Sequence, residues 1–162
     1  MPQQREVITE DPAELIRKYG RDILDSPGFQ QMKQYRHHDK STTYQHSLDV
    51  TMAALRFAKS MRIPVDKRAL VRGCLLHDYY LYNHHTSERK KWHWARHDLY
   101  AAINADRDFG IDDREADIIA NHMWPIHPMR FPLMREGWIL VLADKKVAAV
   151  EAIHGVINSF ID

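Results

Sequence analysis

The segment from about Thr42 to Met61 constrains the fold most, because its apolar residues recur with the 3.6-residue period of an α-helix. Its apolar positions include Leu48, Val50, Met52, Ala53, Leu55, Phe57 and Met61. They form two neighbouring stripes, and an apolar face this broad is typical of a helix in the centre of a domain. We therefore expect other helices to pack around this segment.

Helix-start and helix-stop signals divide the rest of the chain. Asp11, Pro12 and Glu14 stand in the order of an N-cap, a first helical proline and a capping-box glutamate. Gly110 is typical of the residue that follows a helix. The sequence predicts helices over about 11–24, 27–35, 42–61, 66–81, 97–110, 112–122 and 136–161. No alternating segment of useful length indicates a β-strand, so we predict an all-α fold, a compact multi-helix bundle.

Length and composition narrow the class of protein. The chain has 162 residues, near the common size of one domain, and we predict a single domain over 1–162. Its 23 Lys+Arg and 22 Asp+Glu give a net charge of +1, which disfavours a dedicated nucleic-acid or membrane-surface binder. Cys74 is the single cysteine, so no internal disulfide forms. A polar N-terminus and the lack of a long apolar run lead us to expect a cytoplasmic protein.

Polar residues stand where apolar ones are expected. Asp144 has only apolar residues three and four positions away, on its own helix face. These residues are Leu140, Val141, Val147 and Ala148. Asp78, His77 and His122 have mostly apolar neighbours at the same spacing. A buried carboxylate costs several kcal/mol unless it is paired, hydrogen-bonded or bound to a metal, so these four residues need a common partner.

A divalent cation is the partner that satisfies imidazoles and carboxylates together. A single histidine on an apolar face is usually a core residue, and either aspartate alone fits an ion pair with Arg or Lys. The chain has 11 histidines, most of them between His37 and His127, and histidine is the usual side chain for metal ligation. Nitrogen and oxygen ligands suit Fe, Mn, Ni, Co, Zn or Mg. The set as a whole therefore favours a divalent metal site.

The order of these residues resembles a known signature. His46 on the central helix, the doublet His77-Asp78 near the end of the next helix and Asp144 on the last resemble the H…HD…D signature of the HD-domain superfamily. The resemblance spans about 36–150, with the helices of 11–35 expected to pack on it. It implies a metal-dependent phosphohydrolase with an all-helical fold and a metal site in its core. It also implies that His46, His77, Asp78 and Asp144 bind a first ion.

Additional histidines resemble those that hold a second ion in some members of the superfamily. His97 precedes a run of small residues, and His122 follows Ile118-Ile119-Ala120-Asn121. Their presence implies a binuclear site similar to that of small bacterial dinucleoside-tetraphosphate hydrolases, with Asp78 bridging the ions. Whether one ion or two are bound stays open. The doublet is followed by Tyr79-Tyr80 where many members have Ile-Gly, which leaves the substrate open.

The resemblance implies hydrolysis of a phosphate ester, nucleotide-like in character, by a metal-activated hydroxide. We expect Asp78 to orient this nucleophile, and His97 or His127 to protonate the leaving oxygen. Lys145, next to Asp144, is a candidate for phosphate contact. The expected partner is thus a small phosphorylated substrate.

Further residues are candidates for binding that substrate. Arg36 and Lys40 precede His46 and fit phosphate contact, although residues 36–40 fit a solvated polar connector equally. Trp124 and His127 are expected to line the pocket. The segment 83–94 carries histidines, basic residues and two tryptophans, and fits either a lid over an anionic substrate or an exposed loop.

Two other classes of function stay open. The six residues that the resemblance assigns to metal are also compatible with a di-iron oxygenase similar to myo-inositol oxygenase. A non-catalytic sensor of a metal or a nucleotide is the other alternative. A homodimer is compatible with either class.

Overall fold

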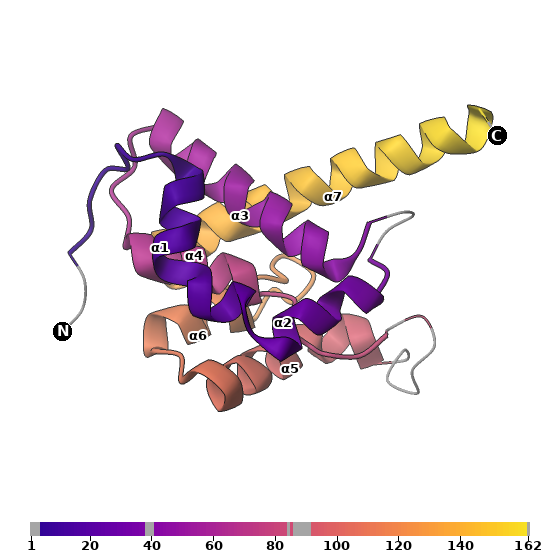
Figure 1. Cartoon of the computed structure of the whole chain (residues 1–162), viewed down its shortest axis with the longest axis horizontal. Coiled ribbons are helices and arrows are strands. Elements are labelled where there is room, and N and C mark those ends of the chain that lie inside the picture. Colours follow the sequence, from indigo (N-terminus) through magenta and orange to yellow (C-terminus); the bar gives the residue numbers. More distant parts are fainter. Residues whose placement is uncertain (1–3, 38–40, 84, 86–91, 162) are drawn as a thin grey trace.

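A computed structural model describes residues 4–37, 41–83, 85 and 92–161. Within them the chain forms seven α-helices and one short 3₁₀ helix (Figure 1). Their bounds are α1 Pro12–Leu24, α2 Pro27–Gln31, η1 Met32–Gln34, α3 Thr43–Ser60, α4 Lys67–Leu76, α5 His93–Phe109, α6 Asp113–Ala120 and α7 Arg135–Ile161. The extended pairings found among the described residues are two isolated bridges, Glu6 with Val65 and Arg36 with Thr42. The predicted all-α class is confirmed.

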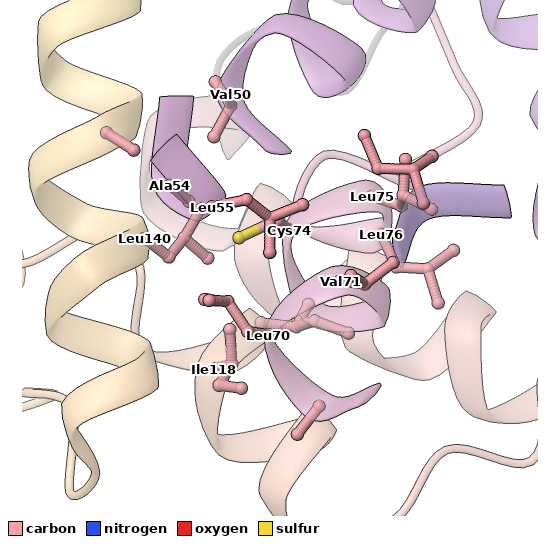
Figure 2. Packing of buried hydrophobic residues seen from close by; sticks show 14 of the residues in the cluster. Val50, Ala54, Leu55, Leu70, Val71, Cys74, Leu75, Leu76, Ile118 and Leu140 are labelled. Carbon is pink, nitrogen blue, oxygen red and sulfur yellow. The ribbon is translucent and has the colours of Figure 1, made fainter. Parts of the chain in front are cut away.

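Helix α4 lies at the centre of the bundle. Apart from Arg68, all of its residues are buried, and it packs against α1, α3, α6 and α7. Figure 2 shows Leu70, Val71 and Cys74 of α4 among side chains of α3, α6 and α7. The apolar face of α3 covers one side of α4, as the periodicity of the sequence predicts. Two of the helices that carry the resemblance are therefore packed together in one core.

Close packing between α4 and α6 depends on Gly73. A Cβ added at this position would lie 2.5 Å from Cγ2 and 2.9 Å from Cβ of Ile118. These distances are shorter than any ordinary van der Waals contact, so only glycine lets α6 approach this closely. The approach matters for the site, because His122 follows α6 and His77 follows α4.

Most of the predicted helix boundaries are confirmed. Thr42, Asp66 and Asp112 each accept a backbone N–H at the start of a helix, and Asp112 forms a full capping box with Glu115. Gly110 has φ +58° at the end of α5, in the left-handed region that favours glycine. Asp11 occupies the N-cap position of α1, but its side chain makes no cap hydrogen bond.

Two predicted helices are too long at their C-terminal ends. The helix predicted over 66–81 ends at Leu76, and the one predicted over 112–122 ends at Ala120. After Leu76, the Tyr79 hydroxyl donates to Asp108 of α5, whereas the Tyr80 hydroxyl lies 3.3 Å from Oγ1 of Thr43. The residues after Leu76 are thus held by contacts with α3 and α5 and leave the helical path. The third difference is at the start of α5, which begins at His93, four residues before the predicted start.

Helix α7 is the longest element, with 27 residues, and its two halves differ in environment. Its first half packs on α3 and α4, whereas its second half extends away from the bundle toward the C-terminus (Figure 1). Val150, Ile153, Val156 and Ile157 are exposed on this second half. None of the described helices combines the length and the hydropathy that a membrane span needs.

Candidate metal centre

Five segments of the fold bring the six predicted ligands together. His46 lies on α3, His77 and Asp78 follow α4, His97 lies on α5, His122 follows α6 and Asp144 lies on α7. All except Asp144 are buried, with at most 4% of the residue exposed, and the side chain of Asp144 is 17% exposed. Buried charged and polar groups at this density need mutual or external partners.

Asp78 stands at the centre of the cluster, and its two oxygens face different histidines. Oδ2 lies 3.5 Å from Nε2 of His77 and 3.8 Å from Nε2 of His46. Oδ1 lies 3.5 Å from Nε2 of His97 and 3.6 Å from Nε2 of His122. One carboxylate thus separates the four imidazoles into two pairs. Each oxygen of Asp78 therefore has its own pair of neighbouring imidazoles.

Asp144 completes the pair of histidines on the Oδ2 side. Its Oδ1 lies 3.0 Å from Nε2 of His46 and 3.6 Å from Nε2 of His77. His46, His77 and Asp144 offer ligand atoms within 4.8 Å of one another, as do His77, Asp78 and His122. A single ion fits among atoms at such distances, because metal–nitrogen and metal–oxygen bonds of about 2 Å bring ligand atoms to roughly 3–4 Å from each other.

The Nδ1 nitrogen of each imidazole, which lies on the ring edge away from the centre of the cluster, is hydrogen-bonded to an acceptor. Nδ1 of His77 donates to the carbonyl of Cys74 at 2.8 Å, and Nδ1 of His122 donates to that of Ile119 at 2.7 Å. Both carbonyls belong to the last turn of a helix, where backbone acceptors lack helical partners. Nδ1 of His97 donates in the same way to the carbonyl of His93 at 3.0 Å. These bonds orient the rings and leave the Nε2 lone pairs directed at the centre, as in metal-ligating histidines.

The donor set fits a divalent cation. Nε2 of His77 is fully buried and has no hydrogen-bond partner among the described residues, which is costly for a polar atom unless a cation occupies the site. The nitrogen and carboxylate donors suit transition ions better than Mg²⁺ or Ca²⁺, which prefer all-oxygen sites.

The charges of the cluster are strongly coupled. Burial opposes ionisation of Asp78 and Asp144, but the surrounding imidazoles hold the pKa of both carboxyls well below the usual range. Burial also opposes protonation of His46, but hydrogen bonds to Asp144 and Glu151 raise its pKa to about 9. Burial, together with His77 and His97, lowers the pKa of His122 to about 3. The two carboxylates therefore stay ionised among the imidazoles, and a bound ion would displace the proton from His46.

A cavity of about 190 Å³ opens onto the cluster. Asp78, His97, His122 and Asp144 form its polar part, and Lys145 lies among its lining residues. The remaining wall is mainly apolar or aromatic and is formed by His37, His93, Trp94, Met123, Ile126 and Ala148. The metal ligands are thus accessible to a small molecule from one side.

The predicted substrate-binding residues lie elsewhere or outside the described residues. Arg36 is exposed, and neither it nor Trp124 and His127 is among the residues that line the cavity. Trp124 packs edge-on against Trp138 at 4.9 Å between ring centroids, and Nε2 of His127 lies 2.9 Å from the carbonyl of Trp94. Lys40 lies outside the described residues. These assignments stay predictions.

The segment predicted as a lid or an exposed loop is described only at its ends. Residues 84 and 86–91 lie outside the described residues. Trp92 and Trp94 are both 60% exposed, and Trp94 lines the cavity. The lid interpretation stays open.

Sequence reasoning missed two residues at the centre, His37 and Glu151. His37 belongs to the segment interpreted as a polar connector, but only 13% of its side chain is exposed. Glu151 is also 13% exposed in its side chain and contacts both His37 and His46. The sequence did hold a signal for Glu151. It follows Asp144 by seven residues, or two helical turns, and therefore lies on the same face of α7 as Asp144.

A helical bundle that gathers four imidazoles and two carboxylates in its core defines an all-α domain with a candidate divalent-metal centre. The family model of the HD domain matches residues 43–149. The chain therefore belongs to the HD-domain family, a superfamily of metal-dependent phosphohydrolases. Neither the curated proteins nor the solved structures that were searched contain a match to the chain.

Proposed function

We propose that this protein is a phosphohydrolase that holds two divalent transition-metal ions and cleaves a small phosphate ester. The observation that carries the proposal is the division of the imidazoles by Asp78, with Oδ2 facing His46 and His77, and Oδ1 facing His97 and His122. In this proposal, His46, His77 and Asp144 would hold one ion, His97 and His122 would hold the other, and Asp78 would contribute to both.

Ions bound at this site would supply a hydroxide at neutral pH and would neutralise charge on the phosphoryl group. Asp78 fixes the spacing of the two halves of the site. The placement of His97 Nε2 at 3.2 Å from His122 Nε2 favours His97 as a ligand rather than as a proton donor.

Lys145 is proposed to contact the phosphate. It lines the cavity beside Asp144, and burial around its ammonium group lowers its pKa. Its positive charge would attract an anionic substrate and stabilise the charge that develops on the phosphoryl oxygens.

The cavity wall supports a substrate with a flat or apolar portion. Trp94, Met123, Ile126 and Ala148 line the same cavity as the carboxylates. A nucleotide-like phosphate ester fits this combination, since its base stacks on aromatic surface while its phosphate reaches the ions. We expect the protein to act on such a small molecule in the cytoplasm, either as a monomer or as a homodimer.

The test combines elemental analysis with an activity screen. We expect about two ions per chain, and phosphate release from a panel of nucleotides and phosphomonoesters that stops on chelation and returns with metal. Asp78→Ala should lose both metal and activity, whereas His154→Ala, on the exposed half of α7, should retain both. Oxygen consumption without phosphate release would indicate the oxygenase alternative, and tight nucleotide binding without turnover would indicate a sensor.

A further inference from the structure

We infer that His37 is an additional metal ligand on the Oδ2 side of Asp78, and that Glu151 is a positioning residue that orients His37 and His46 together. The inference rests on the metal centre of the proposed function. Neither residue belongs to the segment 43–149 that matches the family, so this pair extends the centre beyond the shared signature.

The ring of His37 duplicates the orientation of His46. The two rings are stacked, with centroids 3.8 Å apart and planes 19° from parallel. Nε2 of His37 lies 3.3 Å from Oδ2 of Asp78, closer than Nε2 of His46 at 3.8 Å. His37, His46 and Asp78 offer ligand atoms within 4.8 Å of one another. His37 thus presents the same nitrogen to the same carboxylate oxygen as an established member of the cluster.

Glu151 lies at the opposite edges of both rings, in a hydrogen bond with His46 and in an ion-pair contact with His37. Its Oε2 lies 3.4 Å from Nδ1 of His37 and 3.1 Å from Nδ1 of His46. A carboxylate on Nδ1 fixes the tautomer that leaves Nε2 free of its proton, and it raises the basicity of the ligating nitrogen. The other three histidines of the centre use backbone carbonyls for this purpose. His37 and His46 therefore face a carboxylate, which is a stronger hydrogen-bond acceptor than the carbonyls that the other three histidines contact.

The backbone of His37 and of the two residues before it is bonded to the start of α3 and the residues that precede it. Arg36 forms a bridge with Thr42, the N–H of His37 donates to the carbonyl of Ser41 at 3.0 Å, and the N–H of Thr43 donates to that of Tyr35 at 2.9 Å. These bonds connect His37 to the start of α3, which carries His46. The position of His37 relative to the cluster is consequently set by main-chain contacts and not by its side chain alone.

An additional imidazole has a consequence for metal choice. With His37, the Oδ2 side offers three imidazoles and two carboxylates, from His37, His46, His77, Asp78 and Asp144. Nitrogen-rich donor sets favour Co²⁺, Ni²⁺, Zn²⁺ and Fe²⁺ over Mg²⁺. His37 also lines the cavity, so it occupies a position on the side from which substrate enters.

The test is Co²⁺ binding to the full-length chain, measured by competition with a chromophoric chelator and by the visible absorption of the bound ion. A His122→Ala background isolates the Oδ2 side. In that background, His37→Ala should weaken Co²⁺ binding by about 10- to 100-fold and change the Co²⁺ spectrum, and free imidazole should restore the spectrum. Mg²⁺ binding should change less.

Glu151 is tested by two substitutions with different chemistry. Glu151→Ala removes the acceptor and should weaken Co²⁺ binding by about 10-fold, whereas Glu151→Gln keeps one acceptor oxygen and should recover most of that loss. His154→Ala, three residues further along α7 and exposed, is the matched control and should bind Co²⁺ normally.

The outcomes separate this inference from the proposed function. If the wild-type chain binds Co²⁺ and His37→Ala leaves affinity and spectrum unchanged, His37 is not a ligand and the metal centre stands without it. If Glu151→Ala has no effect, the positioning role is wrong. A wild-type chain that binds no divalent ion overturns both the proposed function and the inference.

Discussion

Asp78 lies where the contacts of five histidines meet, because both of its oxygens face imidazoles and both are buried. An isolated carboxylate at this depth would cost several kcal/mol. The histidines therefore hold the charge of Asp78 in place of water, and the loss of one histidine affects the half of the site that it faces.

The division of the site by Asp78 predicts the effect of His122→Ala. Because His122 faces Oδ1, its removal should lower the metal content from about two ions per chain to about one, while the Oδ2 side stays occupied. Elemental analysis of the purified variant measures this directly. His127→Ala, which alters a residue that does not line the cavity, should retain the wild-type metal content. Complete loss of metal in His122→Ala would mean that the two halves do not bind independently.

At the scale of elements, the close approach of α4 to α6 depends on Gly73, which has no side chain. Gly73→Ala would place a Cβ 2.5 Å from Cγ2 of Ile118, which is fully buried, so α6 must move. We expect a net loss of up to about 2 kcal/mol in the free energy of unfolding, since the overpacking cost of roughly 1–3 kcal/mol is offset by about 1 kcal/mol from the helix preference of alanine. Chemical denaturation measures the loss.

A double-mutant cycle provides the control for this prediction. Ile118→Ala removes the Cγ2 atom that the new Cβ would meet, so Gly73→Ala should cost less in that background than in the wild type. Equal costs in the two backgrounds would show that the destabilisation comes from another contact.

Helix boundaries illustrate what the sequence predicts well and what it misses. The caps at Thr42, Asp66 and Asp112 are local, because each side chain bonds its own backbone within three residues. The ends after Leu76 and Ala120 are not local. They depend on distant partners, such as the contact of Tyr80 with Thr43, which no helical spacing reveals.

The sequence placed His77, Asp78 and His122 in the core, and all three are buried, although part of the reasoning was wrong. Asp78 and His122 lie beyond the ends of their helices, so the neighbours counted three and four residues ahead are not on a helix face. The ordered signature remained informative because it does not depend on where a helix ends. His37 and Glu151 escaped because their roles arise from contacts between separate parts of the chain. His37 contacts Asp78 and stacks on His46, and Glu151 contacts His46, 105 residues before it.

At the scale of the whole molecule, Glu136 joins distant segments. This carboxylate is 1% exposed and accepts hydrogen bonds from the Arg5 side chain at 2.9 Å and from the backbone N–H of Asp66 at 2.8 Å. It thereby ties the N-terminal segment and the start of α4 to the start of α7. Burial opposes its ionisation, but these hydrogen bonds hold its pKa below the usual 4.5.

This lowered pKa predicts an acid dependence of stability. A folded-state pKa below the unfolded value contributes stability above pH 4.5, and this contribution is lost as the pH falls through the folded pKa. The free energy of unfolding of Glu136→Gln should therefore change less than that of the wild type between neutral pH and the acid side of 4.5. Urea denaturation across this range, with exposed Glu14→Gln as a control, measures the difference. Parallel curves for Glu136→Gln and the wild type would contradict this role.

Metal removal predicts a change in thermal stability. An ion that binds only the folded chain stabilises it by about 2.7 kcal/mol at a free concentration of 100 times its Kd. For a chain of this length that corresponds to a rise in Tm of roughly 5–10 °C. Calorimetry with and without a chelator checks this, and the shift should be absent in Asp78→Ala. An equal shift in that variant would place the stabilising ion elsewhere.

The candidate metal-binding residues are far apart in the sequence, and this separation affects the order in which a new chain folds and binds metal. His46 and its partner Glu151 are separated by 105 residues, and Asp144 lies on the same last helix. A chain leaving the ribosome presents His46 long before α7 exists, so no early intermediate holds the complete ligand set. Closing so long a segment is a late and slow event compared with forming the individual helices. A newly made molecule should therefore acquire its metal as a final step of maturation, and a bound ion marks a chain whose folding is complete.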